Sequence, residues 1–399
     1  MRRYAKITPE GTTDYLFEEC AARETALAAL TRLFESWGYR RIATPHLEFY
    51  DVFHRMSADW LAEQLYCVTD SSGRLLVLRP DSTLPIARVI STRLQDAALP
   101  LRLYYHQSVF RRSRRYAGLS DEGLQSGVEL LGAGGLRADL EILRCAVDAL
   151  RACEAPRFRI ELGHAAIFRS LADSLGAPDE LRDALAQAIE TKNLPALTQL
   201  LVPCSGSAAE SLRQLPRLFG GAEVLDQARE LFWDPAAREA LDHLTELRKS
   251  LRILGLQDCV DFDLGLVHGR QYYTGMVFRG YIEGSGVTVL SGGRYDALLQ
   301  EFGRPAAAVG FAVEVDPLAK ALPETGAAPQ PPAAALLVFG PAGSEAAALR
   351  YLEDKRAAGV RCEFAMAETL AEVRDYARQH GIARLAVVSG SGAAEESAV

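Results

Sequence analysis

Two kinds of periodicity divide this sequence, and together they limit the folds that it can adopt. From about residue 165 to 255, apolar residues recur at helical spacing throughout. Before and after that stretch stand short segments of strand character, mostly joined by turn residues, such as RLLVLRP, LRLYYHQSVF, GVELLG, FRIELG, GMVFRGYI and VTVLSGG. We therefore predict an α+β fold, in which an antiparallel sheet carries flanking helices and a helical insertion at about 165–255.

The first predicted helix lies in AARETALAALTRLFESWGYRRI, residues 21–42. Its apolar residues recur at helical spacing, and Gly38 suits the C-terminal cap. The strand predicted next, RRIATPHLEF, contains Pro45, which has no N–H to donate to a ladder. We therefore expect this strand at a sheet edge or an interface.

Near the other end, PETGAAPQPPAAA at 323–335 is a linker by composition. Residues 336–399 then alternate strand and helix as βαβαβ, which predicts a small α/β domain with a parallel sheet, ending in a polar, frayed tail. Residues 1–322 form the larger domain in this reading.

Composition narrows the class of protein. The 399 residues are 49% hydrophobic and 24% charged, which suits two or more ordinary globular domains. We see no signal-peptide core or membrane span, so we expect a cytoplasmic protein. Seven scattered cysteines with no C-x-x-C pair, and dispersed histidines, predict neither a disulfide framework nor a metal site. The net charge of −8 offers no broad basic face, so we do not expect a nucleic-acid partner.

Three stretches carry residues suited to binding a small polar ligand. In LRPDSTLPIAR, Asp81 and Thr83 leave an extended segment on one face, where a carboxylate and a hydroxyl could hold an ammonium group. An equal alternative is that Asp81 only caps the helix that follows.

The second stretch, SVFRRSRRYAGLSDEGLQSGVELLG, is a strand, a loop and a returning strand. Gln125, Gly127 and Glu129 share one face of the returning strand, and the glycine would leave room for a ligand. The alternative is a solvent-facing edge strand beside a solvated arginine loop, Arg111 to Arg115.

The third stretch is DLGLVHGRQYYTGMVFRGYIEG, followed by LSGGRYDAL. Tyr272 and Tyr273 stand among glycines, and Gly292 and Gly293 come directly before Arg294. Aromatic hydroxyls and glycines on neighbouring strands suit the wall of a pocket for a flat polar ring. A tightly packed hairpin would have the same composition.

The order and spacing of these stretches, with TPEGTTDYL near the start, YYTG and GGRYD, resemble histidyl-tRNA synthetase, a class II aminoacyl-tRNA synthetase. The likeness covers about residues 5–320, and the last domain is similar to a shortened anticodon-binding domain. It implies a class II synthetase-like, histidine-binding domain over residues 1–322.

The residues that bind histidine in that family have counterparts in the matching motifs of this sequence, so the resemblance implies a histidine pocket. Asp81 and Thr83 would hold the α-amino group, Arg111 matches the motif 2 arginine, and Gln125 and Glu129 would contact the amino acid. Tyr272 and Tyr273 would lie beside the imidazole. The resemblance further points to four residues that would support the pocket: His268, Arg270, Gly292 and Arg294.

The positions that serve ATP in that family are altered. Ser113 replaces a glutamate of motif 2, and His268 replaces an arginine, although Arg270 lies two residues on. The motif 3 frame Gly-Phe-Ala-x-Gly-x-Glu-Arg reads GFAVEVDP, with Glu314 for a glycine and Pro317 for the arginine that stacks on adenine. Each lost charge-stabilising donor costs about 100- to 1,000-fold in rate. We therefore expect no catalytic residues, no metal and no cofactor.

A histidine pocket without catalysis resembles the synthetase-like regulatory subunits of ATP phosphoribosyltransferase, the first enzyme of histidine biosynthesis. The resemblance implies a short catalytic subunit as partner, L-histidine as feedback inhibitor, and a homodimer within a hetero-oligomer. Two alternatives remain: an active histidyl-tRNA synthetase, and a free-standing sensor of histidine or uncharged tRNA.

Overall fold

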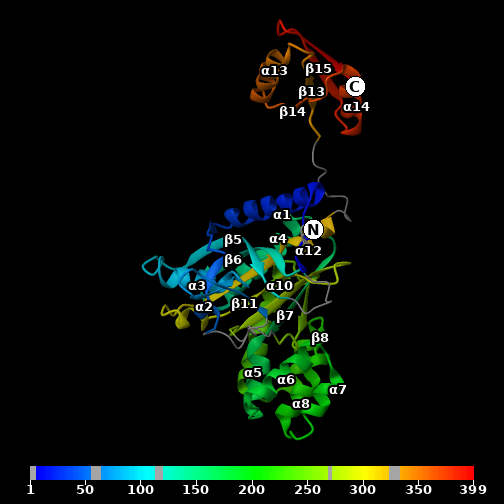
Figure 1. Cartoon of the computed structure of the whole chain (residues 1–399). Helices are drawn as coiled ribbons and strands as arrows, with labels where there is room; N and C mark the ends of the chain where they lie inside the picture. The colour runs from blue at the N-terminus through cyan, green and yellow to red at the C-terminus, as the bar shows by residue number, and fades with distance from the viewer. Residues whose placement is uncertain (1–5, 55–63, 113–119, 268–271, 323–332) are drawn as a thin grey trace. The chain divides into compact units, whose positions relative to one another are not determined.

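The computed structural model describes residues 6–54, 64–112, 120–267, 272–322 and 333–399. The chain divides into two compact units, Met1–Ala328 and Pro329–Val399 (Figure 1). Among the described residues, no helix is long and apolar enough to cross a membrane.

The larger unit is built on a sheet of nine strands in the order β1-β5-β6-β12-β11-β10-β7-β9-β8. Most neighbours are antiparallel, but β1 runs parallel to β5 and β9 parallel to β7, so the sheet is mixed. The fold class is confirmed, with helices packed on a large sheet and a helical insertion. The strand bounds are β1 Arg40–Arg41, β5 Leu101–Phe110, β6 Glu122–Leu131, β7 Phe158–His164, β8 Phe219–Gly220, β9 Val260–Asp263, β10 Met276–Ile282, β11 Thr288–Arg294 and β12 Ala308–Glu314.

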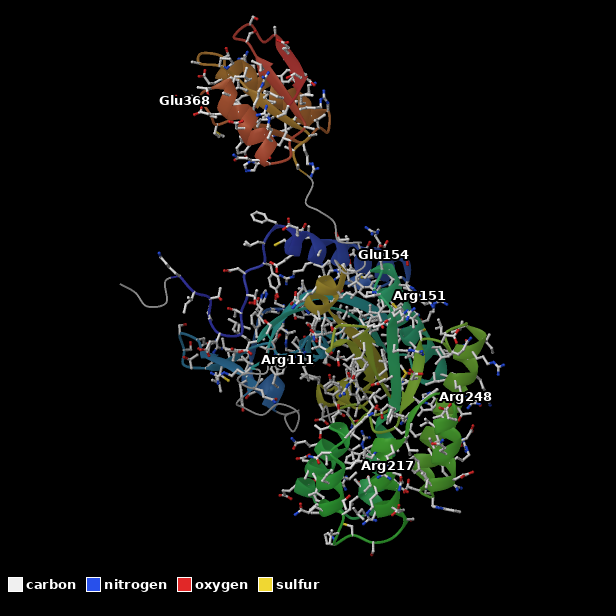
Figure 2. The ribbon with its side chains drawn as sticks, turned by 90° about the vertical axis from the view of Figure 1, so that its right-hand side faces the viewer. Arg111, Arg151, Glu154, Arg217, Arg248 and Glu368 are labelled. Carbon is white, nitrogen blue, oxygen red and sulfur yellow. The ribbon has the colours of Figure 1, made fainter. Side chains whose placement is uncertain are left out.

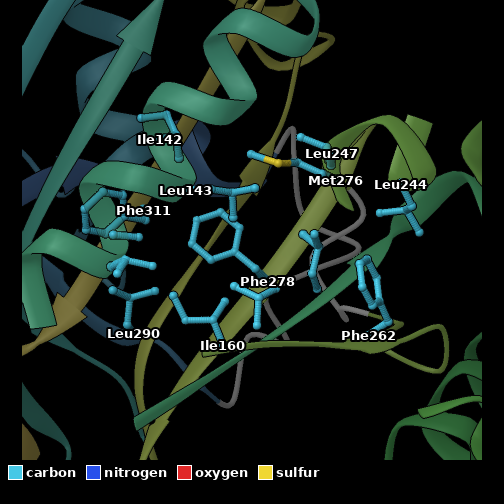
Figure 3. Close-up of a cluster of buried hydrophobic side chains, with 14 of the residues drawn as sticks. Ile142, Leu143, Ile160, Leu244, Leu247, Phe262, Met276, Phe278, Leu290 and Phe311 are labelled. Carbon is cyan, nitrogen blue, oxygen red and sulfur yellow. The ribbon is translucent and has the colours of Figure 1, made fainter. Parts of the chain in front are cut away.

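One face of this sheet is covered by α1 (Phe17–Ser36), α4 (Gly135–Ala152) and α12 (Val315–Ala321). In α1 the buried residues Ala22, Ala26, Ala29, Leu30 and Phe34 recur every three or four positions, and the helix ends before Gly38, whose φ is +80°. Figure 3 shows Ile142 and Leu143 of α4 packed over Phe278 and Phe311 of the sheet. This apolar layer fixes one face of the sheet and leaves the other for the site.

The opposite face packs against α2 (Tyr50–His54), α3 (Thr83–Ser91), α11 (Leu298–Glu301) and a sheet in the order β2-β4-β3. The strands of this smaller sheet are β2 Leu47–Phe49, β3 Tyr66–Thr69 and β4 Leu75–Leu78. The prediction of one strand over residues 40–49 was wrong, because β1 and β2 belong to different sheets. The chain bends between them at Thr44 and Pro45, whose carbonyl oxygens accept hydrogen bonds from the buried Arg79 guanidinium at 2.7 and 3.1 Å.

The insertion comprises α5 (Ala165–Ser174), α6 (Asp179–Glu190), α7 (Leu194–Leu200), α8 (Ser207–Gln214), α9 (Glu223–Leu231) and α10 (Pro235–Ile253). The side chain of Asp234 caps α10 by accepting from the Ala236 and Ala237 amides, each at 3.0 Å, and Pro235 suits the first helical position. The predicted helical insertion is therefore present, with only the two-residue strand β8 interrupting it.

The smaller unit has strands in the order β14-β13-β15-β16, with α13 (Glu345–Ala357) and α14 (Leu370–Gln379). Its strands are β13 Leu336–Phe339, β14 Cys362–Phe364, β15 Arg384–Val388 and β16 Ala394–Ala398. The predicted parallel strands are present, but the predicted frayed tail was wrong, because β16 pairs antiparallel with β15. There the Glu396 side chain accepts from Tyr351 and Lys355, contacts that a polar composition does not reveal.

Candidate functional site: a carboxylate-lined pocket

A polar pocket lies over the middle of the large sheet, on the face opposite α1 and α4. The lining comes from the first residue of α3 and the two residues before it, from β5, β6, β11 and β12, and from two tyrosines outside these elements. Its residues are Asp81, Ser82, Thr83, Tyr105, Gln125, Glu129, Tyr273, Ser291, Tyr295, Gly310, Phe311 and Ala312.

Two glycines in register form the floor of the pocket. Gly310 of β12 pairs with Glu129 of β6 on one side and with Gly293 of β11 on the other. A Cβ at Gly310 would lie 2.1 Å from a Glu129 carboxylate oxygen, and one at Gly293 would lie 2.7 Å from the Tyr273 ring. The missing side chains therefore let Glu129 and Tyr273 lie directly on the sheet.

Glu129 is almost completely enclosed, with 2% of its surface exposed. One oxygen accepts from the Thr83 hydroxyl at 2.8 Å, and the other accepts from the Tyr295 hydroxyl. Burial raises the pKa of Tyr295 well above its ordinary value, and the neighbouring Glu129 adds to the shift. The phenol therefore keeps its proton and acts as a donor to the carboxylate.

Asp81 caps α3, which is one of the two roles considered for it from the sequence, and it also contacts a tyrosine of the pocket region. Its Oδ1 accepts from the Leu84 amide at 3.0 Å in the first turn of α3, and its Oδ2 accepts from the Tyr272 hydroxyl at 3.4 Å. Beside it, the Ser82 hydroxyl is buried and has no hydrogen-bond partner among the described residues. Buried polar atoms are normally paired, so Ser82 offers a hydrogen bond to a bound molecule.

Arg111 and Gln125 lie at one end of the pocket, where β5 and β6 meet the end of β12. The Arg111 Nε donates to the Pro80 carbonyl at 2.6 Å, and Figure 2 marks where the side chain lies. The Gln125 Nε2 donates to the Glu314 carboxylate at 2.6 Å. Both residues therefore belong to one polar cluster beside the pocket.

Tyr272 and Tyr273 are buried next to each other, with ring centroids 4.9 Å apart. Tyr273 lines the pocket, while the Tyr272 ring stands 5.8 Å from that of Tyr295, nearly at a right angle. The Tyr273 and Tyr295 rings thus form an aromatic wall, and Tyr272 packs beside both. Of the seven residues predicted from the sequence, five line the pocket: Asp81, Thr83, Gln125, Glu129 and Tyr273. Tyr272 contacts Asp81, and Arg111 contacts Pro80 beside it.

Of the four predicted supporting residues, the two that the structure describes, Gly292 and Arg294, do not line the pocket. Gly292 faces the helix-covered side, where an added Cβ would meet Phe311 and Phe278, and Gly293 faces the pocket instead. Arg294 is buried behind the pocket and donates to Asp139 of α4 at 2.9 Å and to Asp296 at 2.9 Å. Burial opposes its charge, yet Asp139 and Asp296 raise its pKa above the ordinary value. His268 and Arg270 lie outside the described residues, as does Ser113.

Sequence reasoning missed Tyr105, Tyr295, Ser291 and the role of Gly310. Tyr295 and Ser291 alternate with Gly293 along β11 and its end, so strand periodicity alone could have placed them on the pocket face. Tyr105 pairs with Gly127, and a Cβ at Gly127 would lie 2.6 Å from the Tyr105 hydroxyl. The room expected at Gly127 for a ligand is therefore filled by a tyrosine of the protein.

Two features of the structure concern the binding of ATP and of metal ions. Pro317 lies in the first turn of α12, so no arginine side chain extends from that position. Within the described parts of the chain, no group of three His, Cys, Asp or Glu residues could hold a metal ion. Chemically, the site offers two carboxylates, hydroxyl groups and an aromatic wall, which suit a ligand rich in N–H donors.

Comparisons with known proteins agree with this architecture. The histidyl-tRNA synthetase family model matches residues 11–318. A protein of Clostridium kluyveri named ATP phosphoribosyltransferase regulatory subunit is 36% identical over 381 residues, covering 94% of this chain and 97% of that protein. A protein of the same name from Symbiobacterium thermophilum is 41% identical, covering 94% of this chain and 95% of its own length.

A crystal structure from Bacillus halodurans C, described as an ATP phosphoribosyltransferase regulatory subunit/histidyl-tRNA synthetase, superposes with a TM-score of 0.83. It is 31% identical in sequence and covers 97% of this chain and 98% of its own. This chain therefore belongs to the histidyl-tRNA synthetase family and, within it, to the ATP phosphoribosyltransferase regulatory subunits.

Proposed function

We propose that this chain is the non-catalytic regulatory subunit of ATP phosphoribosyltransferase, required for the first step of histidine biosynthesis. In this proposal it works in the cytoplasm, binds L-histidine in the carboxylate-lined pocket and passes feedback inhibition to a short catalytic subunit. The observation that carries the proposal is the paired burial of Asp81 and Glu129 beside three tyrosines, in a relative of the regulatory subunits.

The pocket supports L-histidine as the ligand because its groups complement those of the amino acid. Glu129 can accept a hydrogen bond from an imidazole N–H, and Asp81 can accept from the ammonium group. The unpartnered Ser82 hydroxyl adds a further hydrogen bond beside Asp81. An aromatic wall on one side and a sheet floor on the other suit a flat ring.

The proposal that this chain is not catalytic rests on the residues at the positions where the synthetases of this family bind ATP. Pro317 cannot stack on adenine as an arginine would, and the Glu314 carboxylate stands beside Arg111 where phosphates would be drawn. A chain with these replacements can recognise an amino acid without activating it. This supports a sensor of histidine rather than an active ligase.

The partner is proposed from the names of the relatives, which describe a subunit of a larger enzyme. We propose that the chain forms a homodimer within that hetero-oligomer, through the segment around Pro45. On β2, next to Pro45, Leu47 and Phe49 leave 44% and 46% of their surfaces exposed, and Val68 of β3 leaves 41%. Contiguous exposed apolar side chains mark contact surfaces in soluble proteins.

The proposal is tested by calorimetry and by histidine-dependent exchange between ATP and pyrophosphate. The purified chain should bind L-histidine and show no exchange. The Asp81→Ala and Glu129→Ala variants should each lose about 1.5–3 kcal/mol of histidine binding, because each removes a charged hydrogen-bond acceptor. Exposed Glu368 of the smaller unit gives the matched control, Glu368→Ala, which should bind like the parent (Figure 2).

Two results would contradict the proposal. One is exchange at a rate typical of synthetases. The other is that both pocket variants bind L-histidine as tightly as the parent, which would place the histidine site elsewhere.

A further inference from the structure

The last residue of β12, Glu314, points to the same face of the sheet as the pocket floor. Gly310 and Ala312, four and two residues earlier on the same strand, both line the pocket. Glu314 pairs in register with Gln125 of β6, as Gly310 pairs with Glu129. Its side chain therefore continues the row of groups that begins inside the pocket, and it is 24% exposed.

The Glu314 carboxylate contacts the cationic end of the site. Its Oε1 accepts from Gln125 Nε2 at 2.6 Å and lies 3.5 Å from Arg111 Nη1, forming an ion pair. Asp316, two residues further on, has a different role, because it lies 2.9 Å from Arg23 and accepts from the Leu124 amide at 2.9 Å. Glu314 thus supplies the carboxylate that Arg111 and Gln125 share.

Arg111 and Gln125 are the groups best suited to the anionic end of an amino-acid ligand, since the charged side chains that line the pocket itself, Asp81 and Glu129, are carboxylates. A guanidinium and a side-chain amide recognise carboxylates and phosphates through the same donors. Here those donors already hold a carboxylate of the protein itself. A ligand's anionic group must therefore share them with Glu314 or displace it.

We propose that Glu314 is a built-in anion that sets the specificity of this site, admitting a ligand with a single carboxylate and rejecting one that carries a phosphate. Sharing Arg111 and Gln125 with Glu314 costs a dianionic phosphate more than a monoanionic carboxylate, because repulsion scales with the charge of the ligand group. This inference rests on the proposed histidine site and names what that site excludes.

The test compares two ligands that differ only at the anionic end. L-histidinol phosphate keeps the imidazole and ammonium groups of L-histidine and carries a phosphate ester where histidine has its carboxylate. Calorimetry at about pH 7.5, where a phosphate monoester carries a charge close to −2, measures the dissociation constants of both ligands. The variants are Glu314→Gln, which removes the charge and keeps the shape, and Glu314→Ala, which also removes the contact with Gln125. Glu368→Gln is the control for a charge change far from any pocket residue in sequence.

In the parent, L-histidinol phosphate should bind at least about tenfold more weakly than L-histidine. In both Glu314 variants the ratio of the two dissociation constants should fall at least about tenfold, while Glu368→Gln leaves it unchanged. Thermal melting of each variant shows whether it is folded. A ratio that stays within about twofold of the parent in a folded Glu314 variant, with L-histidine still bound, would overturn this inference alone. A parent that binds neither ligand would overturn the proposed histidine site as well.

Discussion

The Tyr295 hydroxyl, just beyond the end of β11, donates a hydrogen bond to the Glu129 carboxylate of β6, with the glycine of β12 lying between the two strands. Burial raises the pKa of the Tyr295 phenol, and the neighbouring Glu129 carboxylate raises it further. Because the phenol stays protonated, it holds Glu129 as an acceptor in one orientation. This pair organises the centre of the pocket.

Replacing Tyr295 by Phe should weaken L-histidine binding by about 1–3 kcal/mol, since Glu129 loses a donor that fixes its orientation. The matched control is Tyr376→Phe, which removes the hydroxyl of an exposed tyrosine bonded to Glu363 in the smaller unit at 3.0 Å. Calorimetry on both variants measures the difference. Equal affinities for Tyr295→Phe and the parent would show that this hydroxyl does not position the ligand-binding carboxylate.

The buried ion pair behind the pocket should matter for stability. Asp139 is fully buried and joins Arg294 of β11 to His243 of α10, which lies 3.0 Å from its other oxygen. Asp139→Asn leaves the Arg294 charge poorly compensated and should cost about 3–5 kcal/mol of unfolding free energy. Asp242→Asn, which breaks an exposed pair with Arg229, should cost about 0–1 kcal/mol. Denaturant unfolding measures the loss of unfolding free energy in both variants. Similar losses would show that the buried pair stabilises the protein no more than the exposed pair does.

His106 should make the protein sensitive to acid. Burial, with a smaller contribution from Arg41, lowers its pKa from 6.5 to about 4, and its two ring nitrogens lie 2.8 Å from the Thr31 and Ser126 hydroxyls. Because the folded state resists protonation, the stability from this residue is complete above pH 6.5 and is lost as the pH falls toward about 4. The unfolding free energy of His106→Gln should therefore fall less than that of the parent between about pH 7 and pH 4.5. Equal losses in the two proteins would rule out His106 as a source of the acid sensitivity.

Much of the fold could be predicted because strand and helix periods are visible in the sequence. The segment LRLYYHQSVF is β5 over its whole length, and α1 ends where Gly38 allows a left-handed turn. The break at Pro45 could not be predicted, because it depends on Arg79, which follows β4 and whose guanidinium reaches back to the Thr44 and Pro45 carbonyls. The edge strand β16 was missed for a similar reason, since its polar residues are held by partners distant in the sequence.

The residues of the site also divide into those whose place could be predicted from the sequence and those whose place could not. Glu129 and Gln125 could be placed on one face because a strand alternates every two residues. The choice of Gly293 rather than Gly292 as the floor glycine depends on register with Gly310, which a single strand does not reveal. Arg294 stands beside pocket residues in the sequence, yet its guanidinium pairs with Asp139 of a distant helix. Tertiary pairing, rather than local pattern, decides these positions.

The most direct test of the central claim is to mix the purified chain with the short catalytic subunit from the same organism and measure formation of phosphoribosyl-ATP. We predict that this chain alone makes none, that the catalytic subunit alone is weakly active, and that the mixture is more active and is inhibited by L-histidine. A mixture containing the Glu129→Ala variant should stay active and lose its sensitivity to histidine. No complex on sizing, together with no change in rate on mixing, would contradict the account.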